Sequence, residues 1–287
     1  MKDGRNGRLV FAVAFLLFFL SQASAALAQR WCFAVFSDNH HFEAAYRNVV
    51  ENINAGGPAN PWFPKPDFVV GAGDISPVRR TFQIFREVMG PGIPFIPVRG
   101  NHEGPEDLRF IINDILPAEK PPVSPYDKES ATFYYDWKNV RLIVIDQYAA
   151  YSENMGGRVL LNWVETAIVS AKSADHVFIF FHEPYAPLDV YTDPFWSLLL
   201  NHRDKVRAVF WGHTHHYGRW FLARWSGGID LINVGTAGST GHSDGMNTYV
   251  EICMDGKEAV FRTVQAPDRT KDFKVTNTWK ASAAGRN

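Results

Sequence analysis

The sequence has too few cysteines and too little excess charge for several classes of protein. Its two cysteines exclude a small scaffold held by several disulfides and a zinc module with four cysteine ligands. Lysine and arginine number 29 against 30 aspartate and glutamate, and this formal charge of −1 excludes the strongly basic surface of an electrostatic nucleic-acid binder. There is no Asn-x-Ser/Thr acceptor for N-glycosylation and no visible repeat of solenoid or propeller length.

Sequence motifs of several enzyme classes are also absent. The chain has no G-x-S-x-G nucleophile elbow, no Walker A loop and no G-x-G-x-x-G fingerprint, and Ser239 lies in a Gly-Ser-Thr-Gly stretch without the elbow spacing. These absences argue against a serine hydrolase, a P-loop enzyme and a dinucleotide-binding enzyme. What is present is a composition of 46% hydrophobic and 14% aromatic residues over 287 positions, which predicts a sizeable buried core.

The N-terminal segment has the layout of a secretory signal. Basic residues precede an apolar run at residues 9–20, and an A-x-A cleavage pattern ends at Ala28. The run is shorter than the roughly 20 residues that span a bilayer, so cleavage before Gln29 is favoured over an uncleaved anchor. We therefore expect export to the periplasm or the extracellular space, with no membrane segment in the mature chain.

No linker divides the mature chain. We expect a signal peptide at residues 1–28, one domain at 29–266 and a docked or frayed polar tail at 267–287. Strand-like apolar runs occur at residues 31–36, 68–70, 93–98, 132–137, 140–145, 177–181, 206–210, 220–223, 229–234, 248–253 and 259–264. Helical spacing occurs at residues 42–53, 78–88, 108–116 and 159–168. The alternation of the two patterns in the first two thirds predicts an α/β fold.

Five of the apolar strands stop at aspartate, asparagine or histidine. The endings are Asp38-Asn39-His40, Asp74, Asn101-His102, His182 and His213-Thr214-His215. Loops beyond strand ends line the ligand crevice of α/β sheets, so we expect these side chains to meet. A lone histidine after a strand is usually only hydrogen-bonded, but five of the ten histidines occupy these endings. Imidazole nitrogens mixed with carboxylate oxygens suit Zn, Mn or Fe rather than Mg or Ca.

The other histidines are interpreted as surface residues or hydrogen-bonded core residues. They are His41, His176, His202, His216 and His242. Of these, His216 and His242 are the candidates to reach the mouth of the site.

The order of the five blocks, D-x-H, G-D, G-N-H-E, H and G-H-x-H, resembles the calcineurin-like metallophosphoesterases. The matching residues are Asp38 and His40, Gly73-Asp74, Gly100-Asn101-His102-Glu103, His182, and Gly212-His213-Thr214-His215. The resemblance covers residues 31 to about 264. Purple acid phosphatases of this superfamily carry a tyrosine three residues after the second-block aspartate, where this chain has Pro77, so the chain does not resemble that subgroup.

The resemblance implies two mixed β-sheets packed as a sandwich and flanked by helices, a four-layer αββα arrangement with two metals at one edge. By position, the first metal would be bound by Asp38, His40, Asp74 and His215. The second would be bound by Asp74, Asn101, His182 and His213. Asp74 would bridge the two, because a carboxylate has two oxygens to share between cations. The metals would be first-row transition ions, Mn, Fe or Zn.

The implied function is that of an exported metal-dependent phosphoric ester hydrolase. Two metals about 3.5–4 Å apart lower the pKa of a shared water, so a metal-bound hydroxide would attack a small phosphomonoester or phosphodiester. The resemblance gives His102 a catalytic role, as general acid to the leaving group or as a positive charge on the phosphoryl oxygens.

Two other functions stay open. One is a nuclease or phospholipid-directed phosphodiesterase, and the other is a non-catalytic interaction module that retains the fold. The expected partner is a small phosphate ester, with no extended nucleic-acid surface, and the oligomeric state is open. Cys32 and Cys253 either form a disulfide, which export and the implied proximity of the first and late strands favour, or remain buried thiols.

Overall fold

The computed structural model describes residues 30–40, 42–56, 64–222, 228–238 and 243–282. The expected signal peptide, His41, Ser239 and His242 lie outside the described residues. The fold below is that of the unit that begins at Trp31.

The first sheet has six strands in the order β13-β12-β11-β1-β2-β3. Its members are β1 (Trp31–Phe36), β2 (Phe68–Ala72), β3 (Phe95–Val98), β11 (Met246–Asp255), β12 (Glu258–Pro267) and β13 (Lys274–Ser282). Strands β1, β2 and β3 run parallel, whereas β1, β11, β12 and β13 pair antiparallel. The three parallel strands therefore end at the same edge of the sheet.

The second sheet has seven strands in the order β4-β5-β6-β7-β8-β10-β9. Its members are β4 (Ser124–Pro125), β5 (Phe133–Trp137), β6 (Val140–Val144), β7 (His176–Phe180), β8 (Val206–Trp211), β9 (Tyr217–Leu222) and β10 (Ile229–Val234). Strands β6, β7, β8 and β10 are parallel, and both sheets are mixed.

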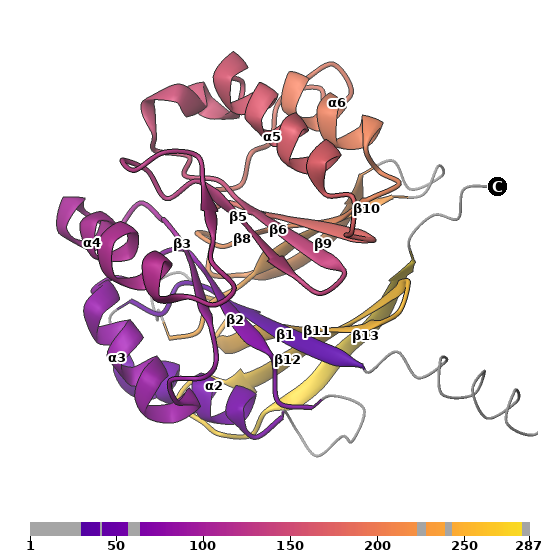
Figure 1. Cartoon of the computed structure of the whole chain (residues 1–287). Coiled ribbons are helices and arrows are strands. Elements are labelled where there is room, and N and C mark those ends of the chain that lie inside the picture. The colour runs from indigo at the N-terminus through magenta and orange to yellow at the C-terminus, as the bar shows by residue number, and fades with distance from the viewer. Residues whose placement is uncertain (1–29, 41, 57–63, 223–227, 239–242, 283–287) are drawn as a thin grey trace, which may run out of the picture. The chain divides into compact units, whose positions relative to one another are not determined.

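Helices cover the outer faces of the two sheets. They are α2 (Glu43–Asn54), α3 (Val78–Met89), α4 (Pro105–Phe110), α5 (Arg158–Ser170) and α6 (Pro194–Asn201), with the short turns η1 (Ile111–Ile115), η2 (Leu116–Ala118) and η3 (Ala150–Met155). Figure 1 shows α2 and α3 beside the six-stranded sheet and α5 and α6 beside the seven-stranded sheet. Among the residues described above, no helix is long and apolar enough to cross a membrane.

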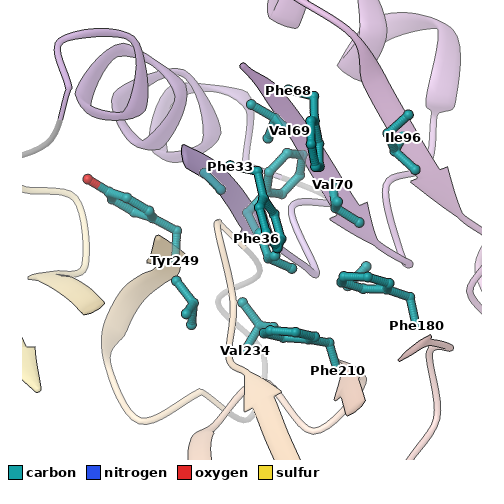
Figure 2. Packing of buried hydrophobic residues seen from close by; sticks show 14 of the residues in the cluster. Phe33, Phe36, Phe68, Val69, Val70, Ile96, Phe180, Phe210, Val234 and Tyr249 are labelled. Atoms are coloured by element: carbon teal, nitrogen blue, oxygen red, sulfur yellow. The ribbon is translucent and has the colours of Figure 1, made fainter. Parts of the chain in front are cut away.

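Alternation along the strands of the second sheet builds the layers. Phe178 and Phe180 of β7 face the first sheet and belong to the core between the sheets, whereas Val177 and Ile179 face α5 and α6. Figure 2 shows Phe36 of β1 together with Phe180 and Phe210 of the second sheet pointing into the same interior. The fold is thus the predicted four-layer αββα sandwich. The core between its two sheets holds the parallel strand ends of both sheets in fixed positions.

Strand β13 and helix α6 were not predicted from the sequence, nor were the short elements β4 and η3. Residues beyond Pro267, expected to form a docked or frayed tail, include β13, which pairs with β12 along the sheet edge. Its alternation is hard to detect because Val275 is exposed and Trp279 is the large buried apolar side chain of the strand. Helix α6 is capped by the Asp193 side chain, which accepts from the backbone N–H of Trp196.

Of the two alternatives for Cys32 and Cys253, the structure has the disulfide. Cys32 and Cys253 lie directly opposite each other on β1 and β11 and are bonded. The bond therefore lies between neighbouring strands near the start of β1, at the end of the strand away from Asp38.

Candidate metal centre

The predicted ligands meet at the edge where the parallel strands of both sheets end. The side chains gather in two clusters in which every ligand atom lies within 4.8 Å of the others. The first cluster comprises Asp38, His40, Asp74 and His215, and the second comprises Asp74, His182 and His213. Asp74 belongs to both, as the sequence predicts for a bridging carboxylate. Asn101, predicted for the second site, places Oδ1 3.0 Å from Nδ1 of His213.

The first cluster is almost closed to solvent. Asp38, His40 and Asp74 are buried, and His215 is partly buried. Nε2 of His215 lies 3.3 Å from Oδ1 of Asp38, and Nδ1 of His40 lies 4.0 Å from Oδ2 of Asp74. Two carboxylates facing two imidazoles form a donor set that suits a first-row transition ion.

The second cluster opens to solvent on one side. Asp74 and His182 are buried, whereas Asn101 and His213 are exposed. The rings of His182 and His213 meet edge to face, with centroids 5.3 Å apart and planes at 87°. A ligand from solution can therefore reach this cluster from the side of Asn101 and His213.

The His182 side chain presents one ring nitrogen to the site. Its Nδ1 lies 3.0 Å from the carbonyl oxygen of Ala72, which only accepts, so Nδ1 carries the proton. Its Nε2 is buried and faces Oδ2 of Asp74 at 3.2 Å. A fixed imidazole whose inward nitrogen faces the carboxylate shared by both clusters fits a metal ligand, so the residues present fit a bound cation.

Charge within the site shifts the pKa values of its central groups. Burial raises the pKa of Asp74, but the imidazoles of His182 and His102 lower it more, to about 2. Burial lowers the pKa of His182, but Asp74 and Asp38 raise it more, to about 9. Burial is the main cause that lowers the pKa of His40. The two carboxylates thus make the site electronegative, which favours a cation.

Four of the ligand residues have left-handed backbone conformations. The φ angles are +52° at Asp38, +51° at Asp74, +69° at His213 and +58° at His215. Non-glycine residues rarely adopt these angles, and such strain concentrates at functional sites. Each turn directs its side chain toward the common edge instead of continuing the strand.

The motif glycines leave room for the ligands. A Cβ on Gly73, whose φ is +89°, would lie 2.2 Å from Nδ1 of His182, and one on Gly212 would lie 2.4 Å from Oδ2 of Asp38. Glycine is therefore required where the backbone of one strand end touches a ligand from another. This contact explains why glycine precedes Asp74 and His213 in the sequence.

His102 lies beside both clusters but belongs to neither of them. Its backbone N–H donates to Oδ1 of Asp74 over 3.0 Å, and its Nε2 lies 3.7 Å from Oδ2 of Asp74. The side chain is 45% exposed. It is therefore accessible to a molecule that approaches the site from solution.

Several groups that hold the ligands were not assigned a role from the sequence. The Ser37 hydroxyl donates to Oδ2 of Asp38 over 2.6 Å. Oε2 of Glu103 accepts from the backbone N–H of Asp74 over 3.0 Å and of Gly100 over 2.5 Å, and burial raises the pKa of Glu103 to about 7. Glu103 is the last residue of the G-N-H-E block and Ser37 directly precedes the D-x-H block, so their position in the sequence was the available signal.

Two further side-chain amides hold the turns that carry the candidate ligands, although they lie far from these turns in the sequence. Nδ2 of Asn233 donates to the carbonyl oxygen of Gly212 over 3.1 Å and to the Thr214 hydroxyl over 2.6 Å, which holds the G-H-x-H turn. Gln147 bonds to the backbone of the His182 turn. Neither residue stands in a motif, and no sequence signal distinguishes them.

The remaining described histidines behave as predicted for surface or core residues. His176 is buried, and its Nε2 lies 3.3 Å from the carbonyl oxygen of Gly256. Nε2 of His202 lies 3.8 Å from Oε1 of Glu165. His216, a candidate for the mouth of the site, is exposed, with Nδ1 2.6 Å from the carbonyl oxygen of Thr214.

Comparison with known proteins identifies a family. The model of the calcineurin-like phosphoesterases matches residues 33–217, more than half of the chain. A search of curated proteins finds no match.

Solved structures with a similar fold are distant. A single mutant of Vps29 from Entamoeba histolytica is 13% identical, with a TM-score of 0.45, and the match covers 87% of this chain and 98% of that one. A predicted phosphoesterase from Streptococcus pneumoniae is 14% identical, with a TM-score of 0.42 and coverage of 88% and 98%. A cold-active protein-tyrosine phosphatase of a Shewanella species is 14% identical, with a TM-score of 0.41 and coverage of 86% and 80%. At these scores none of the three informs function.

Proposed function

The chain belongs to the calcineurin-like phosphoesterase family, and on that basis we propose that it is an exported hydrolase of small phosphate esters with a two-metal active site. The observation that carries the proposal is the pair of histidine and aspartate clusters that share Asp74. A site for two cations on one bridging carboxylate is the arrangement that phosphoryl transfer by two metals requires.

Each residue of the clusters has a defined part in this proposal. Asp38, His40, Asp74 and His215 would hold the first metal, and Asp74, Asn101, His182 and His213 would hold the second. Two first-row transition ions bound there would supply Lewis acidity, lowering the pKa of a shared water and neutralising charge on the phosphoryl oxygens. The open side of the second cluster, at Asn101 and His213, would admit the ester.

His102 would act on the leaving group. Its side chain is half exposed beside the clusters, so it can reach the departing oxygen of an ester seated on them. There it would donate a proton as general acid, or hold positive charge against the phosphoryl oxygens. The stacked ring of His40 limits the orientations that the imidazole of His102 can take.

Export is supported by the disulfide between Cys32 and Cys253. Structural disulfides persist in oxidising compartments and are rare in a reducing cytosol. Together with the signal-like N-terminus, this bond favours a periplasmic or extracellular enzyme.

A substrate panel tests the function. The purified protein, loaded with Mn²⁺, Zn²⁺ or iron, would be assayed on p-nitrophenyl phosphate, bis-p-nitrophenyl phosphate, cyclic nucleotides, a phospholipid and DNA. Turnover of the small mono- or diesters, lost on chelation and restored by metal, is the expected result. Preferred turnover of DNA or phospholipid would replace the proposed substrate class. Metal binding without turnover of any ester would contradict the hydrolase and favour an interaction module that retains the fold.

A further inference from the structure

We propose that Gln147 is a positioning residue for the second metal subsite, acting through the backbone of His182. The inference rests on the proposed function, because it assigns His182 to a metal. Gln147 stands outside every motif that the sequence presents, in the turn that follows β6.

The amide of Gln147 binds the His182-Glu183 peptide at three points. Its Oε1 accepts from the backbone N–H of His182 over 2.9 Å and from that of Glu183 over 2.7 Å. Its Nε2 donates to the carbonyl oxygen of Glu183 over 3.0 Å. One side chain thus satisfies three backbone groups at the point where β7 ends, groups that no strand partner holds there.

Two further contacts, together with the bonds from Gln147, hold His182 in place. The carbonyl oxygen of His182 accepts from the backbone N–H of Gly212 over 3.0 Å, and the Nδ1 of its ring donates to the carbonyl oxygen of Ala72. The first contact comes from the end of β8 and the second from β2, so Gln147 is the anchor from β6. With all three anchors in place, Nε2 of His182 is directed at Asp74 across the gap between the two sheets.

The turn that carries Gln147 also connects to the other ligand of this subsite. Asp146 accepts from Nη1 of Arg99 over 3.3 Å, and Arg99 directly precedes Gly100-Asn101. The Tyr148 hydroxyl donates to Oε1 of Glu183 over 2.8 Å. Asp146, Gln147 and Tyr148, in the turn after β6, therefore contact the segments that present His182 and Asn101, both assigned to the second metal. We assign to Gln147 the part of this arrangement that fixes His182.

Hydrogen bonds from outside the ligand set tune metal affinity, and their loss typically costs about 10–100-fold. The test uses Gln147→Met, which keeps the length of the side chain and removes all three bonds. Gln147→Glu keeps the two accepted bonds. The matched control is Gln265→Met, because Gln265 likewise donates to one group and accepts from another, Thr248 and Thr276, on the first sheet.

The readouts are Mn²⁺ binding to the metal-free full chain by calorimetry and hydrogen exchange of the peptide that spans residues 182–183. For Gln147→Met we expect the weaker Mn²⁺ equivalent to bind at least about tenfold more weakly, the tighter equivalent to be unchanged, and exchange at residues 182–183 to accelerate. We expect excess Mn²⁺ to restore the kcat of Gln147→Met. Gln147→Glu should bind Mn²⁺ more tightly than Gln147→Met, and Gln265→Met should match the wild type in both readouts.

Three outcomes would overturn the inference. These are unchanged Mn²⁺ binding and exchange in Gln147→Met, equal weakening of both Mn²⁺ equivalents, or the same losses in Gln265→Met. A wild-type chain that binds no metal would contradict the proposed function. In that case accelerated exchange in Gln147→Met would show that the residue orders the His182 turn for another purpose, and the assignment to a metal subsite would be wrong.

Discussion

The imidazole rings of His40 and His102 lie face to face, with centroids 4.3 Å apart and planes 18° from parallel. The two rings differ in access, because the side chain of His40 is 5% exposed and that of His102 is 45% exposed. His40 points inward to the first cluster, and His102 forms the outer layer of the stack. In the proposed function the pair therefore separates a candidate metal ligand from a residue that is accessible to the substrate.

The first prediction concerns His102→Ala. If His102 donates the proton to the leaving group, this change lowers kcat by about 10²–10⁴-fold. The metal content should stay at the wild-type level, because His102 belongs to neither cluster. Steady-state kinetics and elemental analysis of the same sample check both statements.

Two comparisons sharpen the test of His102. His40→Ala and His215→Ala should lose metal together with rate. An ester of p-nitrophenol needs little protonation on departure and should suffer less than an alkyl ester. Equal slowing of both esters would point to stabilisation of phosphoryl charge, and loss of metal in His102→Ala would make it a ligand.

The second prediction concerns the shared carboxylate. Asp74→Asn removes the one negative charge that both clusters use, so both metals should be lost or weakly held. Asp67→Asn is the control, because Asp67 pairs with Lys138 outside the clusters. Elemental analysis after reconstitution with Mn²⁺ or Zn²⁺ gives the answer. A variant at Asp74 that retains two tightly bound metals would contradict the bridging role.

The third prediction uses two glycines with similar positive φ angles. Gly73 and Gly90 have φ angles of +89° and +83°. Alanine at either position is strained because φ is positive, at a cost of about 1–3 kcal/mol. Only at Gly73 would the new Cβ collide with His182, since nothing lies within 4 Å of a Cβ on Gly90. We expect both variants to lose stability in urea but only Gly73→Ala to lose metal as well. Equal metal content in the two would show that His182 can move without cost to the site.

The fourth prediction concerns the disulfide. Replacing Cys32 and Cys253 together by serine should lower the free energy of unfolding by about 2–5 kcal/mol. Metal content should not change, because Cys32 stands near the start of β1 and Asp38 follows its end. Urea unfolding with and without reductant measures the loss. A wild-type protein whose stability is insensitive to reductant would contradict a bonded pair in solution.

The fifth prediction is a pH dependence of stability that His176 causes. Burial, together with the neighbouring Arg207, lowers the pKa of His176 from 6.5 to about 4. The folded state therefore binds this proton less readily than the unfolded state, so the stabilisation is fully present above pH 6.5 and is lost as the pH falls toward 4. At about 1.4 kcal/mol per pKa unit the loss is at most about 3 kcal/mol. Urea unfolding at several pH values should give a flatter profile for His176→Gln, and identical slopes would refute the assignment.

The sequence predicted those candidate ligands that directly follow an apolar strand. Asp38, Asp74, His182 and His213 each follow a short apolar strand, so their convergence followed from the general property that parallel strands end at one edge. Gln147 and Asn233 were not found this way. Each acts through hydrogen bonds to a backbone many positions away. A glutamine after a strand, as at Gln147, or an asparagine within one, as at Asn233, carries no signal of such a partner.

The sequence by itself determined the set of candidate ligands, because residue type and the ends of apolar runs are local properties of the chain. Its resemblance to the calcineurin-like phosphoesterases implied the αββα layers, and the pairing of Cys32 with Cys253 was left open. Only the tertiary structure decided which nitrogen of His182 faces Asp74, why alanine does not fit at Gly73, and that Cys32 and Cys253 are bonded. It also decided that residues after Pro267 form an edge strand, since β13 depends on pairing with β12 more than on its own pattern. These features depend on distances between segments far apart in the chain, and such distances are set by packing of the whole core.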